Sequence, residues 1–329
     1  DSGNACSNAA APADDSPTAD YNAGADAPTY VMVSKTLSDP IFIDMYVGFR
    51  QFCEESGVSC MYRGTEEPTV EKEIEVITQL IAQGVDGIAV IAADFDALEP
   101  ILSQAMGKGI AVVTFDSAAN PDSRAVHVEQ ASIDLVGRMQ MQSALAICGG
   151  AGSTGTIGIL SAQPESQLHA DWCAAMLKEV EDHPDDYKNI TVLPIAYGDD
   201  LPDKSTTEAQ AMLQNYPDLD AIISPTTVGI LAAAKVIQDL GSDCKVTGVG
   251  LPSEMAPYIE SGICYDCYLW NPYDQGYLAA AATHSVATGE CKGDVGDTVT
   301  AGRLGTKTVE EYYDGGTQVP LGEPLRFTK

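Results

Sequence analysis

A βα unit in residues 28–52 constrains the fold more than any other stretch of this sequence. Residues 30–33 form a short β-prone run, a polar turn follows, and apolar residues then recur at helical spacing. In that turn, Asp39 and Pro40 are placed as the helix N-cap and the first helical residue. Because ligands of parallel α/β sheets bind where strands end and helices begin, Lys35 is a candidate ligand contact.

The same alternation of strand and helix then repeats along the chain. Strands are expected at residues 58–62, 88–92 and 110–115, and helices at 69–83 and 95–107. After an extended link at 125–128, a second set is expected, with helices at 133–147, 171–181, 204–215 and 229–240 and strands at 155–160, 190–196 and 221–224. This order predicts an α/β protein with two doubly wound parallel-sheet lobes.

Composition excludes several classes of function. The chain has 329 residues, of which 45% are hydrophobic, and a formal net charge of −31. Nucleic acids and anionic membranes are bound mainly through Lys and Arg, so neither is an expected partner. The sequence has no run near the ~18 apolar residues that cross a bilayer and no signal peptide, so we expect any targeting peptide to have been removed.

Residues 1–28 are nearly all small or polar, with Tyr21 as their one core candidate. Such a segment buries too little surface to fold, so we expect a disordered tether that takes no part in ligand binding. A tether of this kind suits a protein held at a membrane surface, and an ordinary floppy terminus is the alternative. The expected location is therefore extracytoplasmic, as a cell-surface lipoprotein or in the periplasm.

The nine cysteines form an odd set, so at least one is unpaired within a monomer. Cys53 and Cys60 are close enough in sequence to be bridged. Cys264 and Cys267 form a CxxC pattern without a second such pair, so buried or disulfide-paired thiols are favoured over a metal site.

Enzyme motifs receive little support. Residues 150–155, GAGSTG, match the GxGxxG pattern, but they follow an expected helix and open a strand, the reverse of a dinucleotide site. The four histidines show no metal-ligand spacing. We expect no cofactor, no bound metal and no catalytic residue.

Several motifs in order along the chain resemble one known family. They are YRGTEEPTV at 62–70, QGVDGIAV at 83–90, VVTFDS at 112–117, NYPDLDAIISP at 215–225 and LWNPYDQGYLA at 269–279. Together they resemble the solute-binding proteins of bacterial sugar ABC importers, in the branch that contains the autoinducer-2 and L-rhamnose receptors. The resemblance runs from about residue 29 to the C-terminus.

This resemblance implies two lobes joined by three crossings, near Glu129, Trp270 and Glu290, with a small sugar or sugar derivative enclosed between the lobes. The expected N-terminal lobe is 29–129 with 271–290, and the C-terminal lobe is 130–270 with 291–329. The implied activity is binding by a monomer, without chemistry, followed by delivery to an ABC permease in the membrane.

The family pattern also implies ligand contacts, residue by residue. Autoinducer-2 receptors that resemble this chain use a lysine, an aspartate and a proline where this sequence has Lys35, Asp116 and Pro225. An acid–amide pair of those receptors is replaced by Leu168 and His169.

The pattern departs once more at Thr227, which replaces an alanine. A leucine cannot accept a hydroxyl hydrogen bond, so Leu168 favours a deoxy face and a sugar over autoinducer-2. Gln167 is a possible substitute acceptor. Autoinducer-2 remains the alternative ligand.

Two aromatic residues are candidates for stacking on a sugar ring. Phe42 begins the first helix and Trp270 lies at an expected crossing, beside Asn271, which we add to the expected contacts. Packing in the core or the hinge is the alternative for both. A less favoured function is an α/β enzyme that uses Lys35 and Asp116 as an acid and a base. A sugar-responsive repressor would need a basic helix-turn-helix before residue 28, where this sequence has the acidic tether instead.

Overall fold

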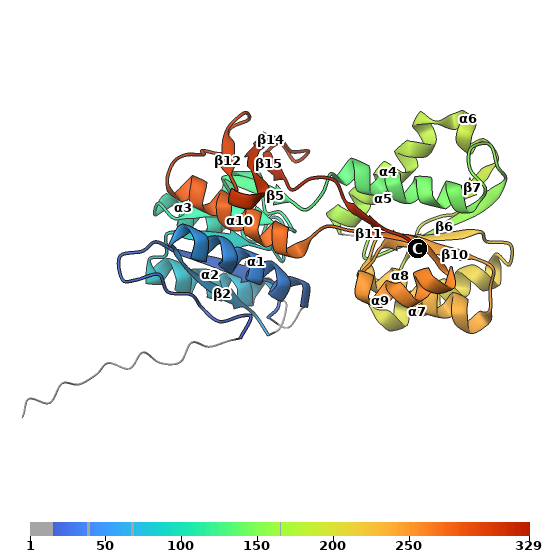
Figure 1. Ribbon diagram of the computed structural model, residues 1–329, viewed down its shortest axis with the longest axis horizontal. Helices are drawn as coiled ribbons and strands as arrows, with labels where there is room; N and C mark the ends of the chain where they lie inside the picture. Colours follow the sequence, from blue (N-terminus) through green and yellow to red (C-terminus); the bar gives the residue numbers. More distant parts are fainter. Residues whose placement is uncertain (1–15, 38–39, 67–68, 165) are drawn as a thin grey trace, which may run out of the picture. The chain divides into compact units, whose positions relative to one another are not determined.

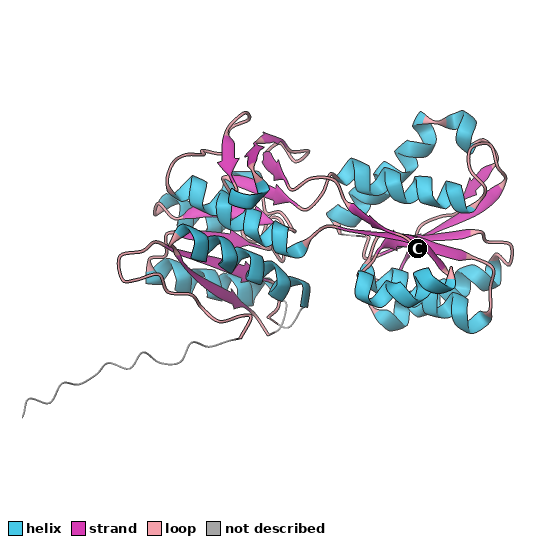
Figure 2. Cartoon of the chain, viewed as in Figure 1, coloured by secondary structure: helices cyan, strands magenta, loops and turns pink. Residues whose placement is uncertain are grey.

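A computed structural model describes residues 16–37, 40–66, 69–164 and 166–329, except for the side chain of Gln167. The chain divides into two compact units, and each contains one seven-stranded main sheet with helices on both faces (Figures 1 and 2). Unit 1 comprises Asp1–Val128 and Pro272–Val319, and unit 2 comprises Glu129–Asn271 and Pro320–Lys329. The α/β fold class with parallel-dominated sheets is confirmed.

The sheet of unit 1 has the strand order β14-β15-β5-β4-β3-β1-β2. Its five parallel strands are β1 (Thr29–Ser34), β2 (Ser59–Gly64), β3 (Gly87–Val90), β4 (Ala111–Phe115) and β5 (Val126–Glu129). Its long helices are α1 (Pro40–Ser56), α2 (Val70–Gln83), α3 (Glu99–Gly107) and α10 (Pro272–Ala287), with the short 3-10 helix η1 (Pro121–Ser123) before β5. The expected N-cap residue of α1, Asp39, lies outside the described residues.

Side-chain alternation along β1 explains why helices cover both faces of this sheet. Val31 and Val33 point into a core cluster that α2 and α3 complete with Ile77 and Leu102. Tyr30 points the other way, and its hydroxyl lies 2.9 Å from the Nδ1 atom of His284 on α10. The strand is buried on both sides, as expected of a central parallel strand.

Local signals fix the ends of α2. The hydroxyl of Thr69 accepts a hydrogen bond from the Lys72 N–H at the start of the helix. At the other end, Gly84 adopts a left-handed conformation with φ 73°, and its N–H reaches the carbonyls of Leu80 and Ile81. These two caps place the first turn of α2 just after the end of β2.

The main sheet of unit 2 has the strand order β16-β11-β10-β9-β6-β7, with β8 paired to β6. Its strands are β6 (Gly155–Ser161), β7 (Ile190–Val192), β8 (Ala196–Tyr197), β9 (Ala221–Ser224), β10 (Lys245–Val249), β11 (Cys264–Leu269) and β16 (Leu325–Phe327). In Figure 1, α4 (Ile133–Ile147), α5 (Gln167–Asp182) and α6 (Pro184–Tyr187) lie on one face of this sheet. The other face carries α7 (Pro202–Asn215), α8 (Thr227–Leu240) and α9 (Pro252–Ser261).

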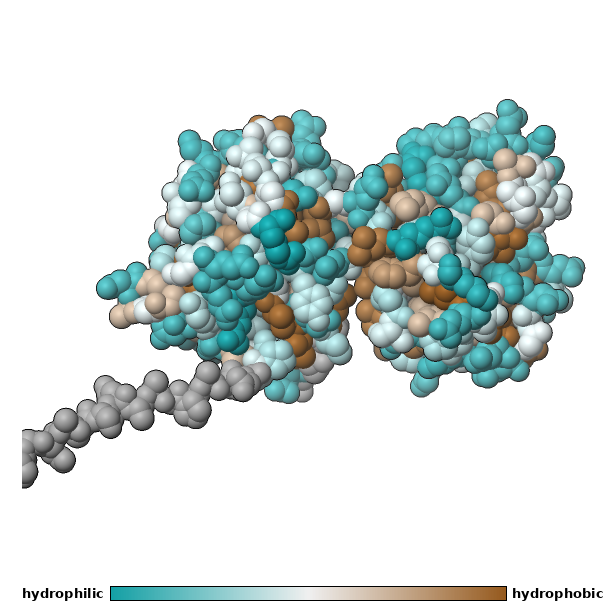
Figure 3. Space-filling model, viewed as in Figure 1, coloured by the Kyte–Doolittle hydropathy of each residue, from teal (hydrophilic) through white to brown (hydrophobic). Residues whose placement is uncertain are grey.

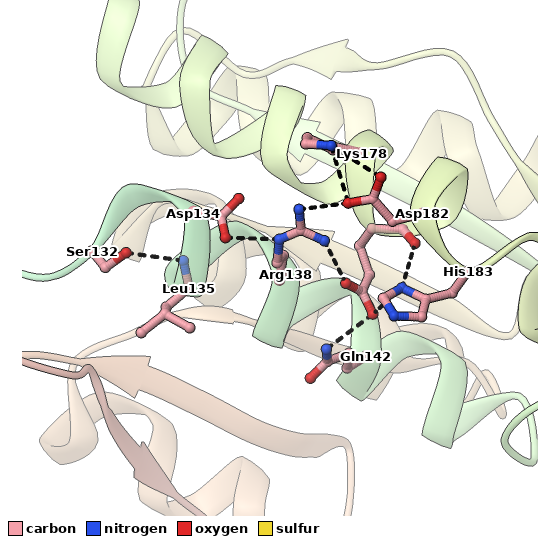
Figure 4. A network of polar contacts seen from close by, with 9 residues as sticks. Ser132, Asp134, Leu135, Arg138, Gln142, Lys178, Asp182 and His183 are labelled. Atoms are coloured by element: carbon pink, nitrogen blue, oxygen red, sulfur yellow. Dashed lines mark hydrogen bonds and ion pairs between the residues drawn. The ribbon is translucent and has the colours of Figure 1, made fainter. Parts of the chain in front are cut away.

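A polar network joins the two helices on the first of these faces. Arg138 on α4 forms ion pairs with Asp134 at 2.8 Å, with Glu179 at 2.9 Å and with Asp182 at 2.7 Å (Figure 4). Gln142, on the next turn of α4, donates to the second oxygen of Glu179. The network fixes α5 against α4, and α5 carries three of the residues that the sequence nominates for ligand binding.

The C-terminal segment differs from the expected lobe boundaries. The strands β12 (Thr298–Thr300), β13 (Thr306–Thr308), β14 (Glu310–Glu311) and β15 (Thr317–Pro320), with the 3-10 helix η2 (Gly302–Leu304), follow α10. Because β14 and β15 extend the first sheet beyond β5, residues 291–319 belong to unit 1. The third boundary therefore lies between Val319 and Pro320 instead of near Glu290, and only the last residues, with β16, join unit 2.

The expected tether also needs correction in its second half. Residues 16–27, which we call the N-terminal strap, pack along β2, the edge strand of the sheet. Tyr21 and Cys60 exchange two backbone hydrogen bonds of 2.9 Å, and Arg63 forms an ion pair of 2.8 Å with Asp20. Edge-strand pairing thus orders a segment that has almost no core residues of its own. Residues 1–15 lie outside the described residues.

The cysteines of the described residues are all free thiols. Cys53 and Cys60 lie close enough to hydrogen-bond, so burial and this bond raise the pKa of Cys53. Cys264 and Cys267 are buried in β11. In the part of the chain that the structure describes, no helix is both long and apolar enough to cross a bilayer. Hydrophilic residues cover most of the face of each unit drawn in Figure 3.

Candidate ligand-binding site

In unit 1, the carboxyl ends of the parallel strands bring two of the nominated residues to the same edge of the sheet. Lys35 follows β1 and Asp116 follows β4, and β3 lies between these strands. The Lys35 Nζ atom donates to the Ser117 hydroxyl at 2.5 Å, and this hydroxyl donates to Asp116 Oδ2 at 3.3 Å. The chain thus runs from an ammonium through a hydroxyl to a carboxylate, which together offer both donors and acceptors to a polar ligand.

The backbone at Asp116 is unusual. Its φ angle is +60°, in the left-handed region, where residues other than glycine pay about 1–2 kcal/mol. Asp and Asn are the side chains that tolerate this conformation best. Directly after it, the Ser117 carbonyl accepts a hydrogen bond of 3.1 Å from Ala92, in the loop that follows β3. Such conformations concentrate at functional sites, which supports a ligand role for Asp116.

Thr65, just past the end of β2, holds the backbone of the Lys35 loop. Its hydroxyl donates to the Lys35 carbonyl at 2.7 Å, and its own carbonyl accepts the Leu37 N–H at 3.0 Å. The threonine is buried, whereas Lys35 is half-buried. Both Thr65 and Ser117 are absent from the sequence-based set, although each lies within three residues of the end of a strand that the sequence predicts.

Glu73 is a further residue of this edge that sequence reasoning missed. Its side chain lies in the first turns of α2 with 1% of its surface exposed, and Oε2 accepts the Ala93 N–H at 2.9 Å. Burial raises the pKa of Glu73 to about 7, although the Ala93 hydrogen bond and the charge of Lys35 both lower it. The signal was present in the sequence, because Glu73 shares the buried face of α2 with Ile77 and Leu80.

Phe42, the stacking candidate of unit 1, lies in α1 and is only 7% exposed. It belongs to the buried stripe of that helix together with Met45, Phe49 and Phe52. The structure therefore places it where helix packing accounts for its burial.

In unit 2, Leu168 and His169 lie in the first turn of α5, which begins earlier than the expected residue 171. The His169 Nδ1 atom is 2.6 Å from the Ser166 hydroxyl, and its ring meets the Trp172 ring edge-on, with 5.4 Å between centroids. Leu168 is half-buried and packs against the core cluster that contains Trp172. Gln167 begins this helix, and its side chain lies outside the described residues.

The two tryptophans of the chain are neighbours in unit 2. Trp172 is 2% exposed and Trp270, just after β11, is 6% exposed, with 6.1 Å between their centroids. Neither indole N–H has a hydrogen-bond partner among the described residues. A buried unsatisfied donor costs about 1–3 kcal/mol, and a ligand oxygen would satisfy it. Trp270 is thus both a packing residue and a candidate donor, and half-buried Asn271 follows it.

A third loop of unit 2 follows β9. Pro225 is buried and Thr227 is the first residue of α8, where it is half-buried. The preceding Thr226 caps the helix by accepting the N–H groups of the next turn, and its hydroxyl donates to Asp200.

Asp199 and Asp200, in the loop after β8, are two consecutive residues in the left-handed region, with φ 53° and 56°. The Asp199 carboxylate pairs with Lys204 at 2.5 Å. Neither residue lies directly after a strand or at the start of a helix that the sequence predicts, so the sequence did not indicate them as ligand contacts. Nothing among the described residues forms a group of three or more His, Cys, Asp or Glu that could hold a metal ion.

A family model described as a periplasmic binding protein domain matches residues 30–291. The chain belongs to this family of periplasmic binding proteins. One similar solved structure is an ABC transporter solute binding protein from Clostridium phytofermentas with bound L-rhamnose. It is 36% identical with a TM-score of 0.82, and the match covers 93% of this chain and 97% of that one.

Two further relatives are more distant. The D-ribose/D-allose-binding protein of Pseudomonas aeruginosa is 23% identical over 248 residues, which are 71% of this chain and 74% of the relative. LsrB from Clostridium saccharobutylicum in complex with AI-2 has a TM-score of 0.77 and 20% identity, over 92% of this chain and 97% of that one, and this likeness shows the fold alone.

The family resemblance expected from the sequence is therefore confirmed, as is the function class of a solute-binding protein of an ABC transporter. Members of this family bind solutes and are not enzymes, so the reading of Lys35 and Asp116 as an acid and base is set aside. The family is extracytoplasmic in general and works with a membrane permease. Which residues contact the ligand remains a prediction for every nominated residue.

Proposed function

We propose that this protein is the receptor of an ABC importer for a small deoxy sugar, of which L-rhamnose is the first candidate. The observation that carries the proposal is the Lys35–Ser117–Asp116 chain at the carboxyl edge of the unit 1 sheet. An ammonium and a carboxylate held through one hydroxyl can bind the adjacent hydroxyl groups of a sugar, which are donors and acceptors at once.

The edge of unit 2 supplies a different chemistry. Leu168 offers an apolar surface without a hydrogen-bond acceptor, and the indole N–H groups of Trp172 and Trp270 offer donors. A face with a methyl group in place of a hydroxyl suits Leu168, because a hydroxyl placed there would lose about 1–3 kcal/mol of hydrogen bonding. L-rhamnose is a 6-deoxy sugar, and the relative at 36% identity has it bound. Pro225, Thr227, His169, Gln167 and Asn271 are the further proposed contacts of unit 2.

Autoinducer-2 is the second candidate ligand, because Lys35, Asp116 and Pro225 match its receptors and the fold is shared with LsrB. The two candidates are separated by titrating L-rhamnose, D-ribose, D-allose and autoinducer-2 calorimetrically into the purified protein. We expect L-rhamnose to bind at least about tenfold more tightly than autoinducer-2, which corresponds to about 1.4 kcal/mol. Submicromolar binding of autoinducer-2 would contradict this preference, and a failure of every sugar to bind would contradict the proposed function.

The finer location and assembly are also proposals. We place the protein at the cell surface as a lipoprotein or in the periplasm, and as a monomer. Its strap contacts β2, the far edge of the sheet from β5, so we expect residues 16–27 to contribute to the stability of unit 1 and not to ligand affinity. Cell fractionation and sedimentation of the purified chain measure both properties, and recovery from the cytosol or as a stable dimer would contradict them.

A further inference from the structure

Among the described residues, one carboxylate oxygen of Glu73 accepts a hydrogen bond and the other has no hydrogen-bond partner. Oε2 accepts the Ala93 N–H at 2.9 Å, whereas Oε1 is buried and has no hydrogen-bond partner among the described residues. A buried carboxylate with an empty oxygen costs several kcal/mol unless a charge or donor compensates it. A role in packing alone does not explain such a residue on the apolar face of α2, because glutamine or leucine would serve without that cost.

The contacts of Glu73 lead to the Lys35–Ser117–Asp116 chain of the proposed unit 1 site. Ala93 belongs to the loop after β3, and its neighbour Ala92 donates to the Ser117 carbonyl at 3.1 Å. Ser117 in turn receives the Lys35 ammonium. Glu73 therefore holds, from inside the unit, the loop that lies between Lys35 and Asp116.

Lys35 is the positive charge that acts on Glu73. Among the residues that the structure describes, it is the one cation whose charge lowers the pKa of this carboxyl. The elements packed against α2 are β1, β2 and α3, together with the loop after β3. Their other ionisable residues are Tyr30 on β1, Cys60, Tyr62 and Arg63 on β2, Glu99 on α3, and Asp94 and Asp96 in the loop. An ammonium has three donors, and the bond to Ser117 uses one of them.

We propose that Glu73 is a positioning residue of the sugar site, which directs the Lys35 ammonium and fixes the loop between Lys35 and Asp116. The inference rests on the proposed function. In its charged form the carboxylate attracts the ammonium and keeps it at the edge of the sheet, whereas the protonated form does not. Sugar affinity is therefore linked to the protonation of Glu73, and the linkage falls in the neutral range because the carboxyl is buried.

The test compares wild type, Glu73→Gln and Glu71→Gln by calorimetric titration of L-rhamnose, D-ribose and D-allose at pH 5.5, 7.0 and 8.5. Glutamine keeps the shape and an acceptor for the Ala93 N–H, and removes only the charge. Glu71 lies on the same helix but is exposed, so its variant is the matched control. At pH 8.5 we expect Glu73→Gln to bind about fivefold or more weakly than wild type, and at pH 5.5 to bind equally well.

The ratio of the dissociation constants of the variant and of wild type, rather than the pH profile of either protein, is decisive, because all the other titratable groups are present in both proteins. A ratio that stays constant from pH 5.5 to 8.5 would overturn the inference. If no sugar binds to wild type, the proposed function fails and the inference falls with it, whereas binding with a constant ratio refutes the inference alone. Should Glu73→Gln not fold, Glu73→Met removes the same charge. Because it also removes the acceptor of the Ala93 N–H, a ratio to wild type that changes between pH 5.5 and 8.5 is the supporting outcome, and a constant ratio overturns the inference.

Discussion

Replacing Glu73 by glutamine is expected to stabilise unit 1 at alkaline pH and to change it little at acid pH. The reason is that burial raises the pKa of this carboxyl from 4.5 to about 7 in the folded chain. The folded state then holds the proton more tightly than the unfolded state, so wild-type stability from this group increases as the pH falls through 7 toward 4.5. Above pH 7 the folded chain must keep a buried charge, and glutamine removes that cost.

The magnitude follows from the same values. A rise of the pKa from 4.5 to about 7 corresponds to about 3 kcal/mol, at 1.36 kcal/mol for each pKa unit. Between pH 8.5 and pH 5 the contribution of Glu73 to the free energy of unfolding changes by about 2.5 kcal/mol of these ~3 kcal/mol. The rest would appear only below pH 5, because the unfolded carboxyl takes up a proton near its own pKa. The free energy of unfolding of Glu73→Gln minus that of wild type should therefore be about 2.5 kcal/mol larger at pH 8.5 than at pH 5.

The two tryptophans make the assay specific for one unit. Trp172 and Trp270 both lie in unit 2, so tryptophan fluorescence follows the urea unfolding of that unit, while far-ultraviolet circular dichroism follows both units. We expect the variant to move the unit 1 transition and to leave the fluorescence transition in place. His127, which burial keeps neutral by holding its pKa well below the ordinary range, destabilises unit 1 below about pH 6.5. That effect is common to both proteins and cancels in the difference.

Two outcomes would refute this reasoning. A difference that does not depend on pH would show that Glu73 does not titrate between pH 5 and pH 8.5. A variant that is less stable than wild type at pH 8.5 would show that Lys35 compensates the buried carboxylate fully. Glu71→Gln, on the exposed face of α2, should differ from wild type by less than about 0.5 kcal/mol at every pH.

Three other substitutions test the site and the fold. Asp116→Asn should lower the affinity for L-rhamnose at least about tenfold, because it removes the charge of the carboxylate. The melting temperature should not fall, because asparagine also tolerates a φ of +60°. An unchanged affinity in calorimetric titration would contradict the placement of the site. Leu168→Asn should shift the ratio of the L-rhamnose and autoinducer-2 dissociation constants toward autoinducer-2 by about tenfold, since it restores a hydrogen-bonding group, and an unchanged ratio would refute the role of Leu168. Asp314→Ala should destabilise unit 1 by about 3–5 kcal/mol in urea unfolding, because it removes the ion-pair partner that lies 2.7 Å from the Arg124 guanidinium. The Arg124 side chain is only 1% exposed, so its charge would stay buried. A loss below about 1 kcal/mol would contradict this prediction.

The sequence was most informative where hydrophobic periodicity and turn chemistry agree. The strand before Lys35 and the strand before Asp116 are short apolar runs followed by polar residues. The second ends where expected, and the first ends one residue later than expected, at Ser34. Because parallel strands end at one edge, the juxtaposition of Lys35 with the Asp116 loop follows from topology alone. The start of α5 was misplaced because residues 163–170 lack an apolar period, although Ser166 stands at the N-cap position.

Features that depend on pairing between distant segments could not be read from local patterns. The strap is ordered by its hydrogen bonds to β2, and nothing in residues 16–27 indicates that partner. The C-terminal strands are two to four residues long, so no period is visible, and which sheet they join decides the third unit boundary. Asp200 was missed because no strand or helix pattern covers it, whereas the position of Glu73 on the apolar face of α2 is visible in the sequence and only its hydrogen bond to the loop after β3 is not.

The carboxyl edges of the two sheets differ in the chemical groups that they offer to a ligand. The edge of unit 1 is charged and holds its groups by hydrogen bonds in series, from Lys35 through Ser117 to Asp116. The edge of unit 2 combines an apolar side chain with two neutral indole donors that have no hydrogen-bond partner within the described part of the chain. The proposed contacts of unit 1 suit adjacent hydroxyl groups, and the proposed contacts of unit 2 suit a partly apolar group with an acceptor oxygen. At the edge of unit 2 a hydroxyl group against Leu168 would lose hydrogen bonding, and at the edge of unit 1 an apolar group would desolvate the charges of Lys35 and Asp116, so a deoxy sugar fits the proposed contacts of each unit best.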